Sequence, residues 1–482
     1  MLLAYVGTGI LLTLVLKPRI TYGTSSDDVT ADVFGESNID LFPVAIGDYD
    51  SDRILDTVFL SKNATSFQIY FGNATVPFLR PRAGFQCNLS SFGTTDVPAR
   101  ITGLSLADFT GDGVLDILVT VKENSEVVVR IIEGDVHRLN CQNSSIRLNG
   151  SNTFLRLKQE PLVTDWNGDM VADLFGEDSS GRKLWIFNEK SEPLKFDCGN
   201  TTCLPIITPH SNAYADLDGD FCPELIIVSQ DSRRNSHLEK YAVVEIKQNK
   251  PKFAKELDKV IRVGKISPQR IGSLMFLDVD QSGKIIPLIP FCSDKDCQRS
   301  GIIILDNDEF KILNIKFADS RNTTWGFLVP DINTPYEETI TLRVGDFDLD
   351  GFPDLIGTVA TVGSSSHKSQ AVVFLNVPCT HRECNYTRTY SLNFDLLASY
   401  DDVVSAVFYD FYDNGLLDVM LTALSAIWCS ASWSKHELHY DESERISAME
   451  RKQWKHSTQI KKLVEQLDNG YLLGYNICAL RY

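Results

Sequence analysis

Short apolar segments recur along most of the chain, and polar turns separate them. Residues 41–47, 66–72, 101–107 and 403–409 read LFPVAIG, SFQIYFG, ITGLSLA and VVSAVFY. These segments are rich in β-branched and aromatic residues and apolar at most positions, which is typical of buried β-strands. The pattern predicts an all-β chain with no long helical stretch before residue 434.

One polar turn recurs between pairs of these strands at a period of about 60 residues, which indicates a repeat architecture. Acidic or other oxygen-bearing residues occupy positions 1, 3, 5 and 9 of the turn. We number the copies turn 1 to turn 7. Turns 1 to 4 and turn 6 carry a full set: Asp48, Asp50, Asp52 and Asp56; Asp108, Thr110, Asp112 and Asp116; Asp165, Asn167, Asp169 and Asp173; Asp216, Asp218, Asp220 and Glu224; Asp346, Asp348, Asp350 and Asp354. Turn 5 has Asp278, Asp280, Ser282 and Ile286, and turn 7 has Asp410, Tyr412, Asn414 and Asp418.

Each period holds about four strand candidates, which is one small antiparallel sheet. Such a sheet cannot bury both faces alone, but sheets placed radially bury their faces between neighbours. The sequence therefore predicts a seven-bladed β-propeller over residues 24–433, and its acidic turns resemble those of FG-GAP and VCBS repeats. A β-helix has a much shorter period, and separate sandwich modules need about 100 residues each.

The spacing of the acidic residues predicts calcium sites in turns 1 to 4 and 6. Calcium takes six to eight oxygen ligands, and residues at positions 1, 3 and 5 of one turn can direct three side-chain oxygens inward. Three or four carboxylates around one point also repel one another unless a cation intervenes. Magnesium fits less well, because it demands a strict octahedron. We expect the calcium to be structural.

An alternative explanation is that the Asp and Asn side chains cap the hairpins without any metal, as in Asx-turns. This explanation suits turns 5 and 7, because Ile286 offers no ligand and Tyr412 is a poor one. Glycine at position 6 eases the turn in turns 2, 5, 6 and 7. Arg53, Met170 and Phe221 replace it, so those turns are expected to use a conformation that a side chain tolerates.

The formal net charge of −18 disfavours nucleic acid and anionic membrane surfaces as main partners, since both are polyanions. Five lysines between Lys247 and Lys259 form a basic run, interpreted as a solvated hairpin face. The sequence contains no nucleophile elbow, P-loop or dinucleotide-binding glycine motif. His436 and His439 are three residues apart, which is the wrong spacing for a zinc helix.

Two features indicate the secretory pathway. Residues 2–16 are apolar and uncharged, which suits a signal peptide ending near residue 23, although Lys17 and Arg19 follow the apolar run instead of preceding it. An uncleaved anchor is the alternative. Acceptor sequences for N-glycosylation occur eight times, at Asn63, Asn73, Asn88, Asn143, Asn149, Asn200, Asn322 and Asn385.

The chain has 11 cysteines, and three pairs share one spacing: Cys198/Cys203, Cys292/Cys297 and Cys379/Cys384. Four intervening residues can close a hairpin tip into a disulfide, which predicts an oxidising compartment. Cys87/Cys141 is a further candidate pair. Zinc needs converging pairs or nearby histidines, and these are lacking.

The turn motif with adjacent Phe-Gly pairs (34–35, 71–72 and 175–176) resembles the FG-GAP repeat of integrin α-subunit propellers. Segments 160–177, 292–300, 324–330 and 376–384 resemble, more specifically, a family of integrin-α-like FG-GAP cell-surface proteins, over residues 30–424. The resemblance implies a glycosylated type I membrane protein with an extracellular propeller, tied to cell adhesion and modulation of T cells.

The chain departs from this family after residue 433, because no transmembrane segment or further extracellular region is visible there. Residues 434–482 are predicted to be an atypical charged tail, partly helical, with an apolar stripe at Ile460, Leu463, Val464 and Leu467. The apolar run 419–431 follows Asp418 directly and is predicted to be the second strand of the seventh blade and not a membrane span.

These observations favour a non-enzymatic, calcium-binding extracellular propeller that binds protein partners. Two alternatives stay open. The propeller could be the platform of a lyase or lipid hydrolase, or a lectin-like glycan binder that uses Trp166, Trp185 and Trp325.

Overall fold

The computed structural model describes residues 12–18, 26–35 and 41–423, except for the internal segments 93–98, 143–145, 149–150, 154, 188–192, 199–202, 220–222, 248–249, 329–339, 364–367, 381–383, 399 and 413. The chain divides into two compact units, residues 1–426 with 475–482, and residues 427–474. All described residues belong to the first unit. The predicted tail, residues 434–482, lies outside them.

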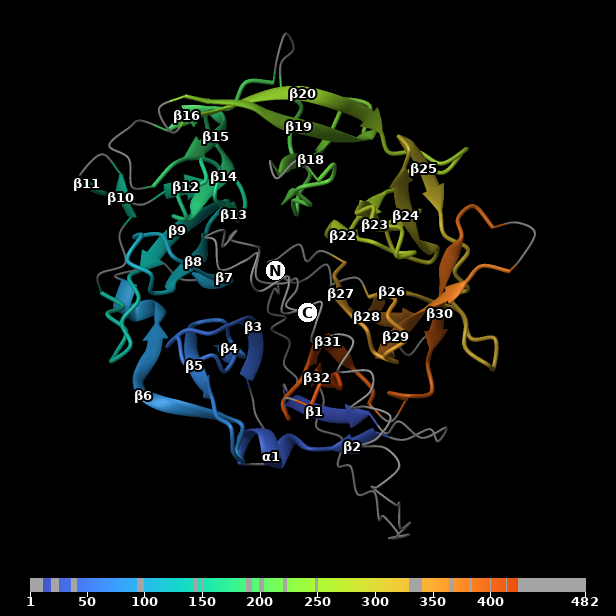
Figure 1. Cartoon of the computed structure of the whole chain (residues 1–482), viewed down its shortest axis with the longest axis horizontal. Coiled ribbons are helices and arrows are strands. Elements are labelled where there is room, and N and C mark those ends of the chain that lie inside the picture. Colours follow the sequence, from blue (N-terminus) through green and yellow to red (C-terminus); the bar gives the residue numbers. More distant parts are fainter. Residues whose placement is uncertain are drawn as a thin grey trace, which may run out of the picture. The chain divides into compact units, whose positions relative to one another are not determined.

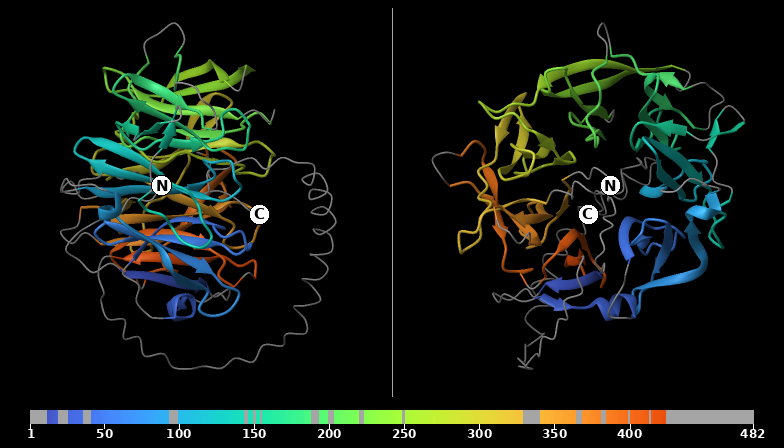
Figure 2. Two further views of the ribbon diagram at one scale, coloured as in Figure 1. Left: turned by 90° about the vertical axis from the view of Figure 1, so that its left-hand side faces the viewer. Right: turned by 180° about the vertical axis from the view of Figure 1, so that it is seen from behind.

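The first unit is all-β, and its sheets stand around a ring in a β-propeller arrangement (Figure 1; Figure 2 shows the ring from the side and from behind). Each acidic turn connects two consecutive, antiparallel strands of one sheet. The first three sheets contain β3 (Leu41–Gly47), β4 (Asp56–Ser61), β5 (Ser66–Gly72) and β6 (Leu79–Asn88); β7 (Arg100–Ala107), β8 (Asp116–Glu123), β9 (Glu126–Ile132) and β12 (Leu155–Leu157); and β13 (Leu162–Thr164), β14 (Asp173–Asp178), β15 (Gly181–Trp185) and β16 (Leu194–Lys195).

The next three sheets are also built from consecutive segments of chain. They contain β17 (Ala213–Ala215), β18 (Glu224–Gln230), β19 (Ser236–Lys247) and β20 (Lys250–Val260); β21 (Arg270–Ile271), β22 (Met275–Leu277), β23 (Ile286–Cys292), β24 (Ser300–Asp306) and β25 (Glu309–Ile312); and β26 (Trp325–Phe327), β27 (Leu342–Gly345), β28 (Asp354–Thr361), β29 (Ser369–Pro378) and β30 (Arg388–Asn393). Neighbouring strands within each sheet are antiparallel.

The remaining large sheet is composite. It pairs β31 (Val403–Tyr409) and β32 (Asp418–Ala423) with β1 (Leu12–Pro18) and β2 (Ser26–Asp28), in the order β2-β1-β32-β31. Within the described residues, six blades are therefore formed by consecutive strands, and not the seven that the sequence predicted. In this sheet, β1 and β2 take the third and fourth places beside the hairpin of turn 7, and the residues that follow β32 lie outside the described part of the chain.

Strand β1 lies inside the segment predicted to be a signal peptide. Leu12 to Leu16 pair in antiparallel register with Ala423 to Val419. Cleavage near residue 23 stays a prediction that the structure does not test.

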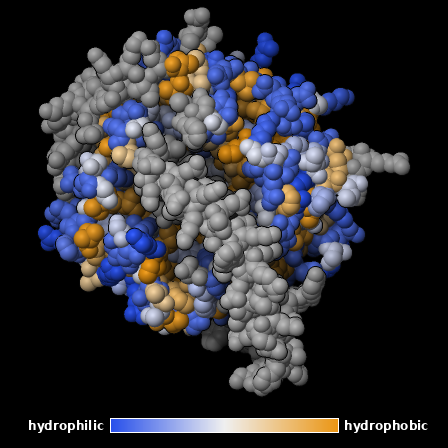
Figure 3. All heavy atoms as spheres, in the orientation of Figure 1, coloured by the Kyte–Doolittle hydropathy of each residue, from blue (hydrophilic) through white to orange (hydrophobic). Residues whose placement is uncertain are grey.

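Apolar cores fill the spaces between neighbouring sheets. One core joins β3–β6 to β7 and β8, and others follow around the ring. A further core packs Tyr409 and Met420 of the composite sheet against Phe59 and Tyr70 of the first sheet. The apolar cores therefore continue around the whole ring, and each sheet packs against two neighbours. This is how a propeller buries both faces of its blades. On the face shown in Figure 3, hydrophilic residues cover most of the coloured surface, and hydrophobic residues lie among them in small groups.

Short elements complete the described structure: helix α1 (Thr30–Phe34), the 3₁₀ turn at Leu89–Phe92, and a two-stranded ribbon of β10 (Ile146–Leu148) and β11 (Ser151–Thr153). Among the described residues, no helix is long and apolar enough to cross a membrane.

All four disulfides expected from the sequence are present: Cys87–Cys141, Cys198–Cys203, Cys292–Cys297 and Cys379–Cys384. The first joins β6 to the segment after β9, in the neighbouring sheet. The other three close short loops. The disulfides support an oxidising compartment.

The tryptophans proposed for a lectin-like surface are buried. Trp166, Trp185 and Trp325 are 1%, 2% and 7% exposed, and Trp166 packs edge-on against Phe175, Tyr214 and Phe253. Their rings pack in the apolar cores between sheets. They are therefore not available on the surface to bind a glycan, which was the basis of the lectin alternative.

Candidate metal-binding turns

The acidic turns share one hydrogen-bond pattern within the described residues. The carboxylate at position 1 accepts from the backbone N–H of position 6, as from Asp48 to Arg53 (2.9 Å) and from Asp346 to Gly351 (3.0 Å). Turns 2, 3, 5 and 7 repeat this bond. The side chain at position 5 accepts from position 7 in turns 1, 2, 3, 6 and 7. Each turn is thus closed by its own acidic side chains, as in Asx-turns.

The backbone at positions 4 and 6 is left-handed whether or not the residue is glycine. At position 6, Arg53 has φ 72° and Met170 has φ 66°, close to the 83° of Gly113. Arg53 and Met170 therefore adopt the same left-handed conformation as glycine does in the other turns. Phe221 lies outside the described residues. Position 4 also has positive φ, at Ser51 and Leu349 as well as at glycines in turns 2, 3 and 4. The bonds to positions 1 and 5 hold this conformation, which costs about 1 kcal/mol for a residue with a Cβ.

The carboxylate at position 9 has a role that the sequence did not reveal. Asp56 is fully buried, and its Oδ2 accepts from Tyr49 N (2.7 Å) and Asp50 N (3.3 Å), while its Oδ1 accepts from Gly72 N (2.7 Å). It therefore ties the turn to the end of the third strand, β5. Asp116, Asp173 and Asp354 make the equivalent bonds to Gly134, Phe187 and Asn376.

Close approach of the third strand to the turn requires glycine at two of these positions. A Cβ on Gly72 would lie 2.4 Å from Ile54 Cγ2 and 2.6 Å from Leu55 O. A Cβ on Gly134 would lie 2.4 Å from Leu115 O. Gly72 belongs to one of the Phe-Gly pairs, which explains that signal in the sequence.

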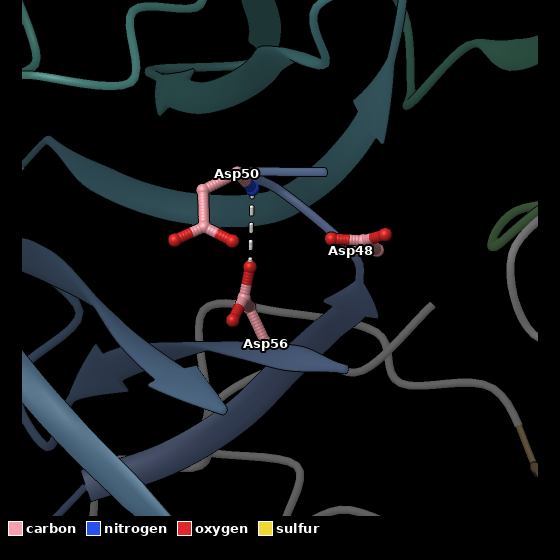
Figure 4. A group of neighbouring side chains, drawn as sticks. All are labelled: Asp48, Asp50 and Asp56. Carbon is pink, nitrogen blue, oxygen red and sulfur yellow. Dashed lines mark hydrogen bonds between the residues drawn. The ribbon is translucent and has the colours of Figure 1, made fainter. Parts of the chain in front are cut away.

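Three turns bring carboxylates together in the way that a metal site needs. In turns 1, 4 and 6, one carboxylate oxygen from each of positions 1, 3 and 9 lies within 4.8 Å of the others. Figure 4 shows this group in turn 1, with Asp48, Asp50 and Asp56 around a common space. The groups are Asp48, Asp50 and Asp56; Asp216, Asp218 and Glu224; and Asp346, Asp348 and Asp354.

Buried oxygens in two of these turns have no hydrogen-bond partner among the described residues. They are Asp48 Oδ1 and Asp50 Oδ1 in turn 1 and Asp346 Oδ1 in turn 6. A buried charged oxygen without a partner costs several kcal/mol. A hard cation would satisfy these oxygens, so the residues fit calcium.

Basic side chains neutralise part of the charge of these carboxylates, and no sequence motif marks them. Arg82 Nη1 lies 2.6 Å from Asp50 Oδ2, and Lys240 Nζ lies 3.1 Å from Glu224 Oε1. Arg388 Nη2 lies 3.7 Å from Asp350 Oδ2. One cation per turn leaves each group of carboxylates net negative.

Turns 2 and 3 carry a neutral side chain at position 3 that bonds within the turn. Thr110 Oγ1 donates to Asp108 Oδ1 (3.4 Å), and Asn167 Nδ2 donates to Asp169 Oδ2 (3.0 Å). These turns present fewer free carboxylate oxygens than turns 1, 4 and 6. In turn 4, Asp220 lies outside the described residues.

Turns 5 and 7 direct their position-3 groups to other partners. In turn 5, Asp280 Oδ2 accepts from Tyr386 Oη and Thr387 Oγ1, both at 3.2 Å. In turn 7, Tyr412 Oη donates to Asp32 Oδ2 (3.1 Å). Their geometry agrees with hairpins capped by Asp and Asn.

Burial makes the position-9 carboxylates hard to ionise. It raises the pKa of Asp56 to about 7; the N–H bonds from Gly72 and Tyr49 oppose the rise, and the charge of Asp50 adds to it. Burial likewise raises the pKa of Asp116 to about 6, of Asp173 to about 8 and of Asp354 to about 6. A dication at the turn would oppose this effect by favouring the charged form.

No known family profile matches the chain. Curated relatives do match over most of its length. The chain is 28% identical to the T-cell immunomodulatory protein of Mus musculus and 29% identical to that of Homo sapiens, in each case over 82% of this chain and 62% of the relative. It is 21% identical to protein linkin of Caenorhabditis elegans, over 78% of this chain and 62% of that protein. The chain thus spans about three fifths of the length of these relatives.

Among solved structures, extracellular domains 1–2 of Drosophila Semaphorin 1b align with 80% of this chain and 85% of theirs. The TM-score is 0.35 and the sequence identity 9%, which is too distant to support any conclusion.

Proposed function

Because the chain is a homologue of the T-cell immunomodulatory proteins, we propose that it is a non-enzymatic extracellular β-propeller that binds protein partners at a cell surface. Three features support the proposal. The relatives are named for immune modulation and not for an enzyme activity, the four disulfides suit an extracellular compartment, and the ring of sheets presents wide surfaces of the kind that propellers use for binding.

The proposal includes structural calcium in turns 1, 2, 3, 4 and 6, with the residues at positions 1, 3, 5 and 9 as ligands. The observation that carries it is the convergence of three carboxylates in turns 1, 4 and 6, with buried oxygens that lack partners in turns 1 and 6. Bound calcium would supply positive charge to these oxygens and clamp the hairpin that carries them.

Calorimetry of the full chain after removal of metal by a chelator tests this part. We expect at least three calcium sites of sub-millimolar affinity, with turns 1, 4 and 6 filled first. Asp50→Ala and Asp348→Ala should each remove one site, and Asp280→Ala in turn 5 serves as the matched control. Fewer than three sites would contradict the calcium proposal and leave the partner-binding proposal standing.

The partner-binding part is tested with the purified, labelled chain on T cells. We expect saturable binding that is lost when the cells are treated with protease, because the proposed partner is a protein. Binding that is non-saturable, or that survives protease treatment, would contradict it.

Entry into the secretory pathway belongs to the same proposal. Of the acceptor asparagines, Asn63, Asn88, Asn322 and Asn385 are exposed in the described structure. Expression in animal cells should give a chain whose mobility increases after enzymatic removal of N-glycans. Membrane attachment rests on the resemblance to the relatives alone.

A further inference from the structure

One end of the blade formed by β17–β20 carries a local excess of positive charge on an acidic molecule. Its outer strands β19 and β20 form a long hairpin at the rim of the ring (Figures 1 and 2). Two turns at one end of this hairpin hold Arg233, Arg234, Arg262 and Lys265, which we call the rim cations. All four are exposed. The chain as a whole has a net charge of −18, so the local sign is reversed.

Backbone bonds place the two turns side by side. The first turn is closed by Asp231 N to Asn235 O (3.0 Å) and Arg234 N to Asp231 O (2.9 Å). The second is closed by Val263 N to Ile266 O (3.1 Å). Between them, Ile261 N donates to Ser236 O (2.7 Å), directly beside the start of β19. The rim cations are therefore neighbours in space although they come from two turns.

The rim cations form no ion pair with any described residue, whereas nearby carboxylates are already engaged. Asp231 accepts from Arg233 N, Asn235 N and Asn235 Nδ2, at 2.8, 2.8 and 2.9 Å. Asp258 pairs with Lys255 (2.6 Å) and His237 (2.9 Å). The four rim cations outnumber these two carboxylates, and Asp258 is already paired with Lys255, so a net positive charge remains at this end of the blade.

This group lies at the opposite end of the blade from the acidic turn. Strand β18 begins at Glu224, the last residue of turn 4, and ends at Gln230, immediately before the first basic turn. Across seven residues a strand spans roughly 20 Å. Charges separated by more than about 8–10 Å are largely screened at physiological salt, so the acidic end does not suppress anion binding at the basic end.

We propose that the rim cations bind a sulfated polysaccharide. Guanidinium groups bind sulfate oxygens in bidentate geometry, and a chain with repeated sulfates can contact several exposed cations at once. The group lies on two turns at one end of the β19–β20 hairpin, which runs along the rim of the ring, a position that an extended polyanionic chain can reach. This inference does not depend on calcium or on a protein partner.

A size-defined heparin oligosaccharide is the probe, and binding of the full chain is measured in calcium-containing buffer at two salt concentrations. The test variant is Arg233→Ala, Arg234→Ala, Arg262→Ala and Lys265→Ala together. We expect it to bind at least about tenfold more weakly than the unmodified chain, and we expect higher salt to weaken binding of the unmodified chain.

The matched control removes the same charge from four exposed cations on other parts of the ring: Arg138, Lys195, Lys316 and Arg321, each changed to alanine. Binding by this control should stay within about twofold of the unmodified chain. Equal loss in both variants would overturn the proposal, since it would show non-specific attraction. Equal binding of a poly-glutamate peptide would also overturn it, in favour of an acidic protein segment. Thermal unfolding curves of both variants verify that each is folded.

Discussion

At the residue scale, the carboxylate at position 9 links the acidic turn to the rest of its blade. In six of the described turns this side chain is at most 1% exposed. In turn 1 its oxygens accept three backbone N–H bonds, one of them from a strand 16 residues away. Such a group stabilises the fold with or without a metal, because its loss leaves buried donors without acceptors.

The first prediction concerns Asp56→Asn. The amide keeps the shape of the carboxylate but places an NH₂ group against the N–H of Gly72 or of Tyr49. We expect the free energy of unfolding to fall by about 2 kcal/mol or more, measured with denaturant in the presence of a chelator. Asp52→Asn is the control, because Asp52 is exposed and, among the described residues, accepts a hydrogen bond from Ile54 N alone. Equal effects of the two substitutions under chelator would contradict the role given to Asp56.

The second prediction compares two reasons why a glycine is needed: close contact between the third strand and the turn at Gly72, and the left-handed backbone at Gly113. Gly72→Ala should destabilise the protein by about 2–3 kcal/mol, because its Cβ would overlap Ile54 and the backbone of Leu55. Gly113→Ala should cost only about 1 kcal/mol, since Gly113 has φ 83° but no atom near the new Cβ. Thermal unfolding of the two variants gives the order, and a larger effect at Gly113 would refute this account of the strand approach.

At the scale of elements, a buried ion pair joins two neighbouring sheets. Arg182 of β15 and Glu239 of β19 have side chains that are each 1% exposed, and their closest atoms are 3.3 Å apart. Ser229 and Tyr241 also donate to Glu239, and Arg182 donates to Leu204 O (2.5 Å). Breaking a buried pair leaves a charge without a partner, which costs far more than breaking an exposed pair.

The third prediction follows from this pair. Glu239→Gln should reduce the free energy of unfolding by about 3 kcal/mol. Glu177→Gln, which breaks the exposed pair with Lys158, should cost less than about 1 kcal/mol. Burial raises the pKa of Glu239, but the charge and hydrogen bonds of Arg182 outweigh it, so the pKa lies below its ordinary value.

A lowered pKa means that the unfolded chain binds the proton at Glu239 more readily than the folded chain. The contribution of Glu239 is therefore complete above the ordinary pKa of glutamate and is lost as the pH falls through the lowered pKa. Denaturant unfolding at a series of acidic pH values should show a smaller loss of stability for Glu239→Gln than for the unmodified chain. Parallel pH profiles would contradict the assignment.

The fourth prediction compares two disulfides. The Cys87–Cys141 bond closes a loop of 54 residues, and the Cys198–Cys203 bond closes one of only 5. Constraint of the unfolded chain gives about 4 kcal/mol for the first and about 2 kcal/mol for the second. Double Cys→Ala variants, compared by denaturant unfolding, should rank in that order. The reverse order would show that native-state effects outweigh chain entropy here.

At the scale of the whole molecule, calcium should act as a clamp at several points of the ring. At a calcium concentration 100 times the dissociation constant, each site adds about 2.7 kcal/mol to the free energy of unfolding. The fifth prediction is that the chelator-treated chain unfolds at a clearly lower temperature than the calcium-loaded chain, and that magnesium restores less of the difference. Coincident unfolding curves with calcium and with chelator would contradict structural calcium.

Local sequence was sufficient for the features that depend on neighbours in the chain. The alternation of apolar segments and acidic turns predicted strands such as 41–47 and 66–72, which the structure forms with the same bounds. The three cysteine pairs five residues apart could be predicted as disulfides, because a short loop keeps its two ends close. Position 4 is glycine in turns 2, 3 and 4 (Gly111, Gly168 and Gly219), and these glycines adopt the left-handed conformation. This signal was not used in the sequence analysis.

The amino-acid sequence by itself determined that this protein is a β-rich repeat chain with oxygen ligands gathered in regular turns, since strand pairing across a tight turn is a local event. Only the tertiary structure decided how the last sheet is completed by β1 and β2, which backbone groups bind the position-9 carboxylates, and that Arg182 meets Glu239. These contacts join residues far apart in the chain. They are set by how the sheets pack around the ring, which no short stretch of sequence encodes.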